Sequence, residues 1–424
     1  MPVASKTSAS STITPEIWSR IFHIATFIPG EWDTAASKVD TRINYTTGAH
    51  RAAYLFVLPL RRSIVEVCRL WYKIGTKLLY ASFWGRSSGS KYHRLAAFAH
   101  VLVARPHLGR FVKRLDLPWN PTVTDNELII RHCPNAIILS TSWCDVRAEN
   151  FPWVRSLPES LRSLEASVES VETAEIIRIL FTLPNLETLS MSSFGEAGPS
   201  SQYPHLRFPA LRQLTLFFER PRIIKSWAPI LSNFHAPKLT AFKTDMGKVS
   251  SAVTSFPRDN WERLTYFGAH LKGYRYITST HFLNLRHLHL YVDSTEGQTL
   301  PKLKQNFPFH QLEILTLCLK LIHCIDVTEW RSHTRQLLAF PLDPHSMPSL
   351  RVLELDWWEG GLEATVKRHA SHKDVMSKFL ISLGSLAMQA EKRGVCFLEV
   401  REGAIYHTPT SMRDVVAACK KQLQ

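Results

Sequence analysis

A spaced leucine pattern recurs through more than half of this 424-residue chain and constrains its fold more than any other feature. The pattern is L-x-x-L-x-L, with other apolar residues at some leucine positions, and a proline often precedes it. Successive copies start 21 to 28 residues apart, except for a last step of 38 residues. One copy alone is common in helices, but ten copies at a nearly constant step predict a repeat architecture. The copies start at Val112, Ala136, Leu161, Leu186, Leu211, Leu239, Leu264, Leu285, Leu312 and Leu350.

Each copy predicts a short strand followed by a return segment. The final x-L-x-L alternates with period two, which is typical of a strand with its leucines facing inward. Residues 173–183 carry Ile176, Ile177 and Leu180 at helical spacing, which predicts a helix on the other side. One unit cannot bury its own leucines, whereas stacked units share a continuous core.

A period of 20–29 residues with this core is the signature of leucine-rich repeats. We therefore expect an α/β fold in which parallel strands line the concave face of a solenoid and helices line its convex face. Most copies lack the asparagine that ends a regular repeat, so we expect an irregular array.

The residues between the leucines of each strand should face outward on the concave side. Aromatic residues and arginine are enriched in binding hot spots, so we interpret some of these positions as a substrate-binding surface. The alternative is that they are ordinary exposed residues of a solenoid without a ligand. The candidates are Arg212, Phe217, Arg286, His289, Tyr291 and Trp357.

Three short helices are predicted before the repeats. Residues 12–27 form the first, because Thr14 suits the N-cap, Pro15 suits the first helical position, and Ile17, Ile21 and Ile24 form one stripe. The second is expected to start in a capping box at residues 63–66 and to continue through residue 71. The third follows residue 75 and reaches residue 84, while residues 28–60 form a long insertion broken by proline and glycine.

These helices resemble an F-box, and in particular the F-box-like domains that precede degenerate leucine-rich repeats in fungal proteins. The resemblance rests on Ile13-Thr-Pro-Glu-Ile-Trp18, followed by Val67-Cys-Arg-x-Trp71 and Leu78-Leu-Tyr80. Two features depart from the motif. Its usual leading leucine is Ile13 here, and the insertion at 28–60 lengthens the gap between the first two helices.

The resemblance implies a substrate-recognition adaptor of an SCF-type cullin–RING ubiquitin ligase. The F-box would bind a Skp-type linker protein, and the repeats would bind a substrate protein for ubiquitylation. The alternative is that the same residues only pack as a cap on the solenoid. Carried over by position, the residues that contact or shape the linker site are Pro15, Ile17, Ile21, Val67, Cys68, Trp71 and Leu79.

The same reading divides the chain into five segments. Residues 1–11 are a disordered tail, 12–85 the F-box-like domain, and 86–111 a linker with a capping helix. Residues 112–400 form the solenoid, and 401–424 form a carboxy-terminal tail or cap.

The positive charge of the chain is local. Of the net charge of +15, residues 51–114 supply +12, with thirteen Lys and Arg residues and one acid, Glu66. An acidic Skp-type linker would match this segment and associate faster with it. Two alternatives stay open: a protein-interaction scaffold without a ligase role, and a nucleic-acid-binding protein, which would lose affinity steeply with salt.

Other classes of protein lack support in the sequence. Seven cysteines without a CxxC pair suit a reducing compartment, so we expect the cytoplasm or nucleus. The longest apolar run, residues 52–60, is shorter than the ~20 residues of a membrane span. The Ser/Thr-rich start lacks an apolar segment, so we expect no signal peptide.

We also expect no enzyme activity, cofactor or metal. The G-x-S-x-G match at residues 85–89 follows a helix rather than a strand, so a flexible linker is the better interpretation. Cys318, His323 and Cys324 lie close together, but no second ligand pair follows at zinc spacing. His287 and His289 are expected at solvent-facing strand positions.

Overall fold

The structure is a computed structural model in which the chain forms two compact units. The described residues up to Ala166 form the amino-terminal unit, and those from Ser167 onward form the carboxy-terminal unit. The residues described are 13–28, 31, 47–85, 91–119, 123–143, 157–168, 180, 183–192, 206–217, 227, 229–244, 256–270, 282–293, 309–320, 347–357, 361–368, 373–401 and 410–423.

The first predicted helix is confirmed as α1 (Pro15–Ala25), with Thr14 at its N-cap and Pro15 at its start. One side of α1 packs on aromatic residues. The rings of Trp18 and Phe22 lie 5.5 Å apart, and each lies 4.7 Å from the ring of Trp71. Because Trp18 and Phe22 are four residues apart, they lie on one face of the helix, and this face forms the contact.

The second predicted helix is longer than expected. The helix α2 (Thr47–Val67) includes the second half of the predicted insertion and contains Pro59 in its interior. Ser63 is therefore not an N-cap, and its hydroxyl instead donates a hydrogen bond to the Pro59 carbonyl at 3.0 Å. Proline has no amide hydrogen to donate, but one side of the apolar run before it is anchored, since Tyr54 is buried with Ile28 and Trp84.

The helix also stops earlier than expected. Cys68 has an extended backbone, with φ −160° and ψ 171°, so it ends α2 and precedes a separate helix, α3 (Arg69–Leu79). The third predicted helix was expected to reach residue 84, and this prediction was wrong. Residues 82–84 form the strand β1 (Ser82–Trp84), because its backbone pairs in parallel with β2 (Arg114–Trp119).

The rest of the amino-terminal unit starts the repeat sheet. Strand β3 (Ile138–Trp143) pairs in parallel with β2 and places Leu139 beside Leu115. At the start of strand β4 (Ser163–Val168), the backbone N–H groups of Arg162 and Ser163 donate hydrogen bonds to the Ile137 carbonyl, both at 2.9 Å. The connecting elements are α4 (Lys91–Ala104), a 3₁₀ helix (Pro106–Phe111) and α5 (Val123–His132).

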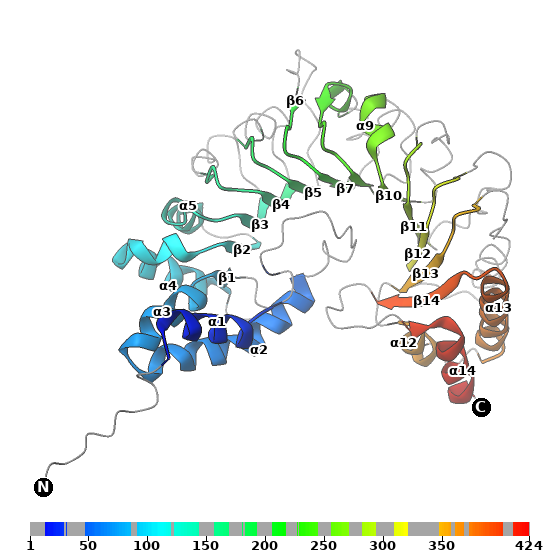
Figure 1. The fold of residues 1–424 in the computed structure, drawn as a ribbon, viewed down its shortest axis with the longest axis horizontal. Helices are drawn as coiled ribbons and strands as arrows, with labels where there is room; N and C mark the ends of the chain where they lie inside the picture. The colour runs from blue at the N-terminus through cyan, green and yellow to red at the C-terminus, as the bar shows by residue number, and fades with distance from the viewer. Residues whose placement is uncertain are drawn as a thin grey trace, which may run out of the picture. The chain divides into compact units, whose positions relative to one another are not determined.

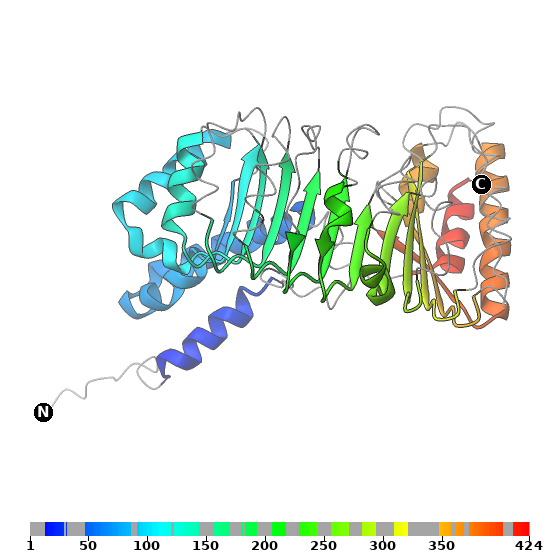
Figure 2. The same ribbon diagram turned by 90° about the horizontal axis from the view of Figure 1, so that it is seen from above.

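The carboxy-terminal unit is built on a row of parallel strands, seen side by side in Figure 2. They pair in chain order, and β15 (Thr410–Ser411) adds the antiparallel end. The strands are β5 (Thr188–Ser192), β7 (Gln213–Phe217), β9 (Ala241–Thr244), β10 (Tyr266–His270), β11 (His287–Asp293), β12 (Ile314–Lys320), β13 (Val352–Trp357) and β14 (Cys396–Arg401).

The short strands β6 (Leu206–Arg207) and β8 (Phe234–His235) pair with each other in a second sheet. The helices described in this unit are α9 (Arg258–Arg263), α12 (Gly361–Arg368), α13 (Lys373–Lys392) and α14 (Met412–Leu423), and the last three pack together beside β14 (Figure 1). The helix α14 lies in the segment predicted as a tail or cap.

The predicted leucine-rich repeats are confirmed. All ten expected strands are present, and each begins two residues after the start of its copy of the pattern. The repeated leucines pair across strands and are buried, as in the row formed by Leu288, Leu315 and Leu353. The molecule is therefore an α/β protein with amino-terminal helices and a leucine-rich-repeat sheet of parallel strands.

Two further findings concern the sequence predictions. The leucine pattern did not predict the flanking strands β1 and β14. The return helix expected at 173–183 lies largely outside the described residues. Within this range the structure describes only Leu180 and Leu183, and both are buried. Within the described part of the chain, no helix combines the length and apolar character that crossing a membrane requires.

Candidate functional site

The outer face of α1 carries exposed isoleucines. Ile17, Ile21 and Ile24 are 51%, 41% and 67% exposed, although they are spaced like the core residues of a helix. We call these three residues the isoleucine stripe. The adjacent face of α1 already packs on Trp71 through Trp18 and Phe22, so this helix has two apolar faces and only one is covered.

The structure places the other residues predicted for the linker site in the same unit. Pro15 is exposed at the start of α1, and Val67 and Cys68 are exposed where α2 meets α3. Trp71 is half-buried against the aromatic face of α1, and Leu79 is half-buried at the end of α3. Most residues predicted for the linker site are therefore exposed, while Trp71 and Leu79 are half-buried residues of α3.

The basic residues of this unit divide into structural and exposed ones. Arg61 is buried, donates to both carboxylate oxygens of Glu31 at 3.0 and 2.7 Å, and donates to the Thr26 carbonyl at 2.9 Å. Ser82 donates to the same carboxylate at 2.6 Å. This network joins the end of α1, α2 and β1, so the charge of Arg61 serves the fold.

Arg114 is also structural, because it is buried and pairs with Asp116 at 2.7 Å. Its guanidinium lies 4.4 Å from the ring centre of Trp84. By contrast, three basic residues on α3 are exposed: Arg69, Lys73 and Lys77. The positive segment found in the sequence thus contributes both an internal network and an exposed basic surface.

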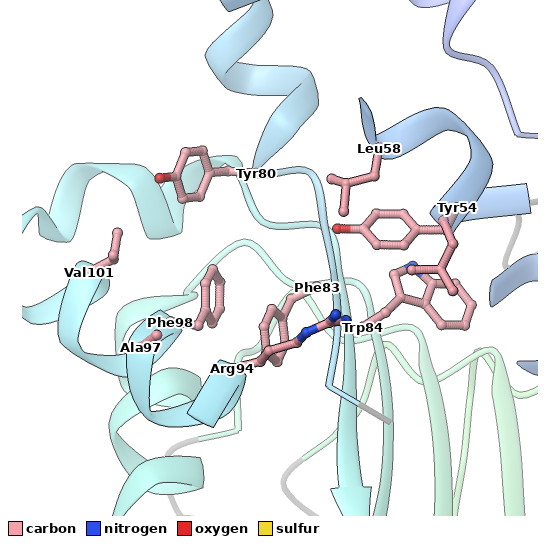
Figure 3. Close-up of a pocket in the computed structure, with 10 residues that line it drawn as sticks. Tyr54, Leu58, Tyr80, Phe83, Trp84, Arg94, Ala97, Phe98 and Val101 are labelled. Atoms are coloured by element: carbon pink, nitrogen blue, oxygen red, sulfur yellow. The ribbon is translucent and has the colours of Figure 1, made fainter. Parts of the chain in front are cut away.

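A mostly apolar pocket of about 360 Å³ lies in the amino-terminal unit among α2, β1 and α4. Figure 3 shows Phe83 and Phe98 side by side, with Arg94 next to them and Tyr54 near Trp84. The Phe83 and Phe98 rings stack with centres 4.1 Å apart. Tyr54 is anchored by a hydrogen bond to the Ser82 carbonyl at 3.1 Å, and burial raises its pKa to about 12, so it stays neutral.

In the carboxy-terminal unit, one register position of five neighbouring strands carries four polar residues and one glycine. From β9 to β13 the paired residues are Lys243, Gly268, His289, Thr316 and Glu354, which we call the polar row. A side chain at Gly268 would come within 2.8 Å of the Tyr266 hydroxyl and 3.2 Å of the Lys243 Cγ. Glycine therefore leaves the space that the two long side chains beside it occupy.

Most of the polar row is buried. Lys243 is 2% exposed and His289 is 0% exposed. Desolvation by burial, followed by the nearby charges of Lys243 and His287, holds the pKa of His289 well below its ordinary value. His289 is therefore a neutral imidazole at physiological pH.

Hydrogen bonds join two members of the row, Thr316 and Glu354, to His287 on β11. The His287 Nε2 lies 2.8 Å from the Thr316 hydroxyl, which donates to a carboxylate oxygen of Glu354 at 2.7 Å. The ring of Tyr291 stacks on that of His289 at 4.4 Å, and the Lys243 ammonium lies 5.1 Å from the centre of the Tyr291 ring. Thr316 and Glu354 of the row are thus hydrogen-bonded to each other, whereas His289 contacts Tyr291 by ring stacking.

This burial corrects part of the predicted substrate surface. His289 and Tyr291 were expected to face solvent, but both are buried, because their rings stack on each other and the Lys243 ammonium lies over the Tyr291 ring. Arg212 and Arg286 are exposed as expected, at the positions just before β7 and β11, and Phe217 is half-buried. The side chain of Trp357 is not among the described residues. The same holds for His323, Cys324 and residues 86–90.

Comparisons with known proteins are limited to the fold. No family model matches the chain, and no curated protein matches it. Among solved structures, it is similar to the leucine-rich repeat-containing protein LegL7 from Legionella pneumophila, at 12% identity and a TM-score of 0.35. The match covers 68% of this chain and 90% of LegL7. A likeness this distant carries nothing about function, and the strand register described above is what establishes the repeat fold.

Sequence reasoning missed two groups of residues. Glu31 lies in the stretch interpreted as an insertion, and only the fold shows that it neutralises Arg61. The residues His289, Cys318 and Asp356 are far apart in the chain, and their spacing matches no metal-ligand motif. The structure brings their ligand atoms within 4.8 Å of one another.

Proposed function

We propose that the chain is a substrate-recognition adaptor of an SCF-type cullin–RING ubiquitin ligase, acting in the cytoplasm or nucleus. The amino-terminal helices bind a Skp-type linker, and the repeat unit binds a substrate protein. The adaptor has no catalytic residues of its own, since its partners carry out ubiquitin transfer.

The observation that carries this proposal is the isoleucine stripe. Three isoleucines on one exposed helix face are unusual, and a partner that covers them gains the free energy of burying apolar surface. Exposed Val67 and Cys68 extend the apolar character of the unit at the α2–α3 junction. An amphipathic partner helix is the kind of ligand that such a surface takes.

The exposed charges favour an acidic partner. Arg69, Lys73 and Lys77 on α3 are exposed, and an acidic linker protein would be steered toward them. Arg61 and Arg114 are buried in ion pairs, so they are not available to a phosphate backbone. This reduces the support for the nucleic-acid alternative.

For the repeat unit, Arg212 and Arg286 are the candidates for substrate contact, together with the half-buried Phe217. His289 and Tyr291 are inside the unit and would contact a substrate only after rearrangement. A substrate-binding surface would therefore lie at the positions that precede the strands.

The test is co-expression of the full chain with a Skp-type linker, followed by purification at high salt. We expect the two proteins to stay together, because apolar contacts resist salt whereas nucleic-acid binding does not. The double variant Ile17→Asp, Ile21→Asp should abolish the complex. Ser19→Asp is the matched control, since it adds the same kind of charge at an exposed position of α1 outside the stripe.

Both variants should keep the circular dichroism spectrum of the wild type, because the altered side chains are exposed. Failure of the wild-type chain to retain the linker would refute the ligase proposal and leave a repeat scaffold. Loss of the complex in Ser19→Asp as well would show that the stripe is not the contact surface.

A further inference from the structure

Three neighbouring strands bring a histidine, a cysteine and an aspartate together inside the carboxy-terminal unit. Cys318 on β12 and Asp356 on β13 are direct partners in the strand register, and His289 lies on β11 beside them. The ligand atoms of the three side chains all lie within 4.8 Å of one another, and all three residues are buried. The leucine-rich repeats create this cluster because they align residues from different copies.

His289 supplies the observation that points to a ligand. Its side chain is fully buried, and neither of its ring nitrogens has a hydrogen-bond partner among the described residues. A buried polar atom without a partner is expensive, at about 1–3 kcal/mol for each group. A bound ion is one of the reasons for which native proteins retain such a group, and an ion between the three side chains would bind one of the two nitrogens.

We propose that His289, Cys318 and Asp356 bind one divalent transition-metal ion, with Zn²⁺ as the preferred ion. Zinc is bound in proteins by thiolate, imidazole and carboxylate groups at about 2.0–2.3 Å. Ligand atoms at those distances in tetrahedral geometry are separated by roughly 3.3–3.8 Å. Because the three side chains lie within 4.8 Å of one another, binding would draw them together. Three protein ligands leave the fourth position of the ion for water or another donor.

The charges of the cluster suit this ion. A Cys318 thiolate and the Asp356 carboxylate together carry two negative charges, which match a divalent cation. A histidine binds such an ion through a neutral imidazole. Lys243 adds a positive charge nearby, and its ammonium is directed over the rings of Phe217 and Tyr291, at 5.7 and 5.1 Å.

The same three residue types also form nucleophilic catalytic sites, but the geometry does not fit that role. A catalytic thiol needs an imidazole hydrogen-bonded to it, with a carboxylate on the other ring nitrogen. His289 makes neither of these bonds among the described residues. In addition, Cys318 is 0% exposed, so a substrate has no access to its sulfur.

The experiment uses the full chain, freed of metal by a chelator and titrated with Co²⁺ as a spectroscopic probe. We expect one equivalent of Co²⁺ to produce a thiolate-to-cobalt charge-transfer band and the visible bands of tetrahedral Co²⁺, and Zn²⁺ to displace it. Cys318→Ser should lose the charge-transfer band. Cys396→Ser is the control, because Cys396 is an exposed thiol of the same unit.

His289→Gln should weaken Co²⁺ binding by at least about 100-fold, since loss of a ligand exceeds the effect of losing an outer-shell partner. His310→Gln, at an exposed position, should bind like the wild type. If Cys318→Ser fails to fold, Asp356→Asn gives an independent test, with weaker binding but a retained charge-transfer band.

Two results would overturn the proposal: a wild-type chain that takes up no Co²⁺, or a folded Cys318→Ser variant with the full charge-transfer band. Linker binding is measured separately, so this outcome does not depend on the ligase proposal.

Discussion

The helix α1 of the amino-terminal unit exposes isoleucines to solvent, while strand β11 of the carboxy-terminal unit carries a histidine into the interior. Each region departs from the usual partition of side chains, in opposite directions. Exposed apolar residues cost free energy that a protein partner can recover, and buried polar atoms cost free energy that a hydrogen bond or a metal can recover. The two departures therefore point to two different kinds of ligand.

The amino-terminal unit also buries charge, and its difference from the polar row is instructive. Arg61 and Glu31 are joined through two hydrogen bonds, whereas neither ring nitrogen of His289 has a hydrogen-bond partner among the described residues. A buried polar group with its partner in place supports the fold. One without a partner suggests a missing ligand.

The largest expected effect comes from breaking the satisfied pair. Arg61→Ala should lower the free energy of unfolding by about 3–5 kcal/mol, because it leaves Glu31 as an unpaired buried charge. Arg62→Ala is the matched control, since Arg62 forms an exposed pair with Glu66 that contributes at most about 0.5 kcal/mol. Urea unfolding of the two variants measures the difference, and equal losses would contradict a structural role for the Arg61 network.

A second prediction separates the two apolar faces of α1. Phe22→Ala should cost about 3 kcal/mol, because Phe22 is buried against Trp71. Ile21→Ala should change stability by less than about 1 kcal/mol, because Ile21 is exposed.

The order of the two effects should reverse in linker binding. When equal amounts of folded protein are compared, Ile21→Ala should weaken the complex with the linker more than Phe22→Ala does. Thermal unfolding and linker pull-down of the same preparations test both parts. A stability loss at Ile21 as large as at Phe22 would mean that the isoleucine stripe belongs to the core.

The smallest effect is expected at His289 in the metal-free chain. His289→Leu removes two unsatisfied buried nitrogens and keeps a similar volume, so stability should change by less than about 1 kcal/mol. Adding Zn²⁺ should then raise the unfolding temperature of the wild type but not of the variant. An ion stabilises the folded state only of a chain that binds it, and the variant lacks the histidine ligand. A large loss in the metal-free variant would indicate that His289 is already satisfied without an ion.

The repeat fold could be predicted well because its signal is local and repeated. Each strand needs only the alternation of leucines within a few residues, and ten copies correct the uncertainty of any single one. The first helix could be predicted equally well from the sequence, since Thr14 and Pro15 mark its start. The boundaries of α2 and α3 were not, because the break at Cys68 and the strand at 82–84 depend on contacts with distant residues.

The leucine period by itself determined that parallel strands stack in chain order, and the isoleucine spacing determined one face of α1. Only the tertiary structure decided which polar residues are buried. The strand register sets Cys318 beside Asp356, and the fold brings the side chain of His289, two residues before the register partner of Cys318, close to both. Burial depends on what packs over a side chain, and that information is distributed over the whole chain rather than carried by the residues themselves.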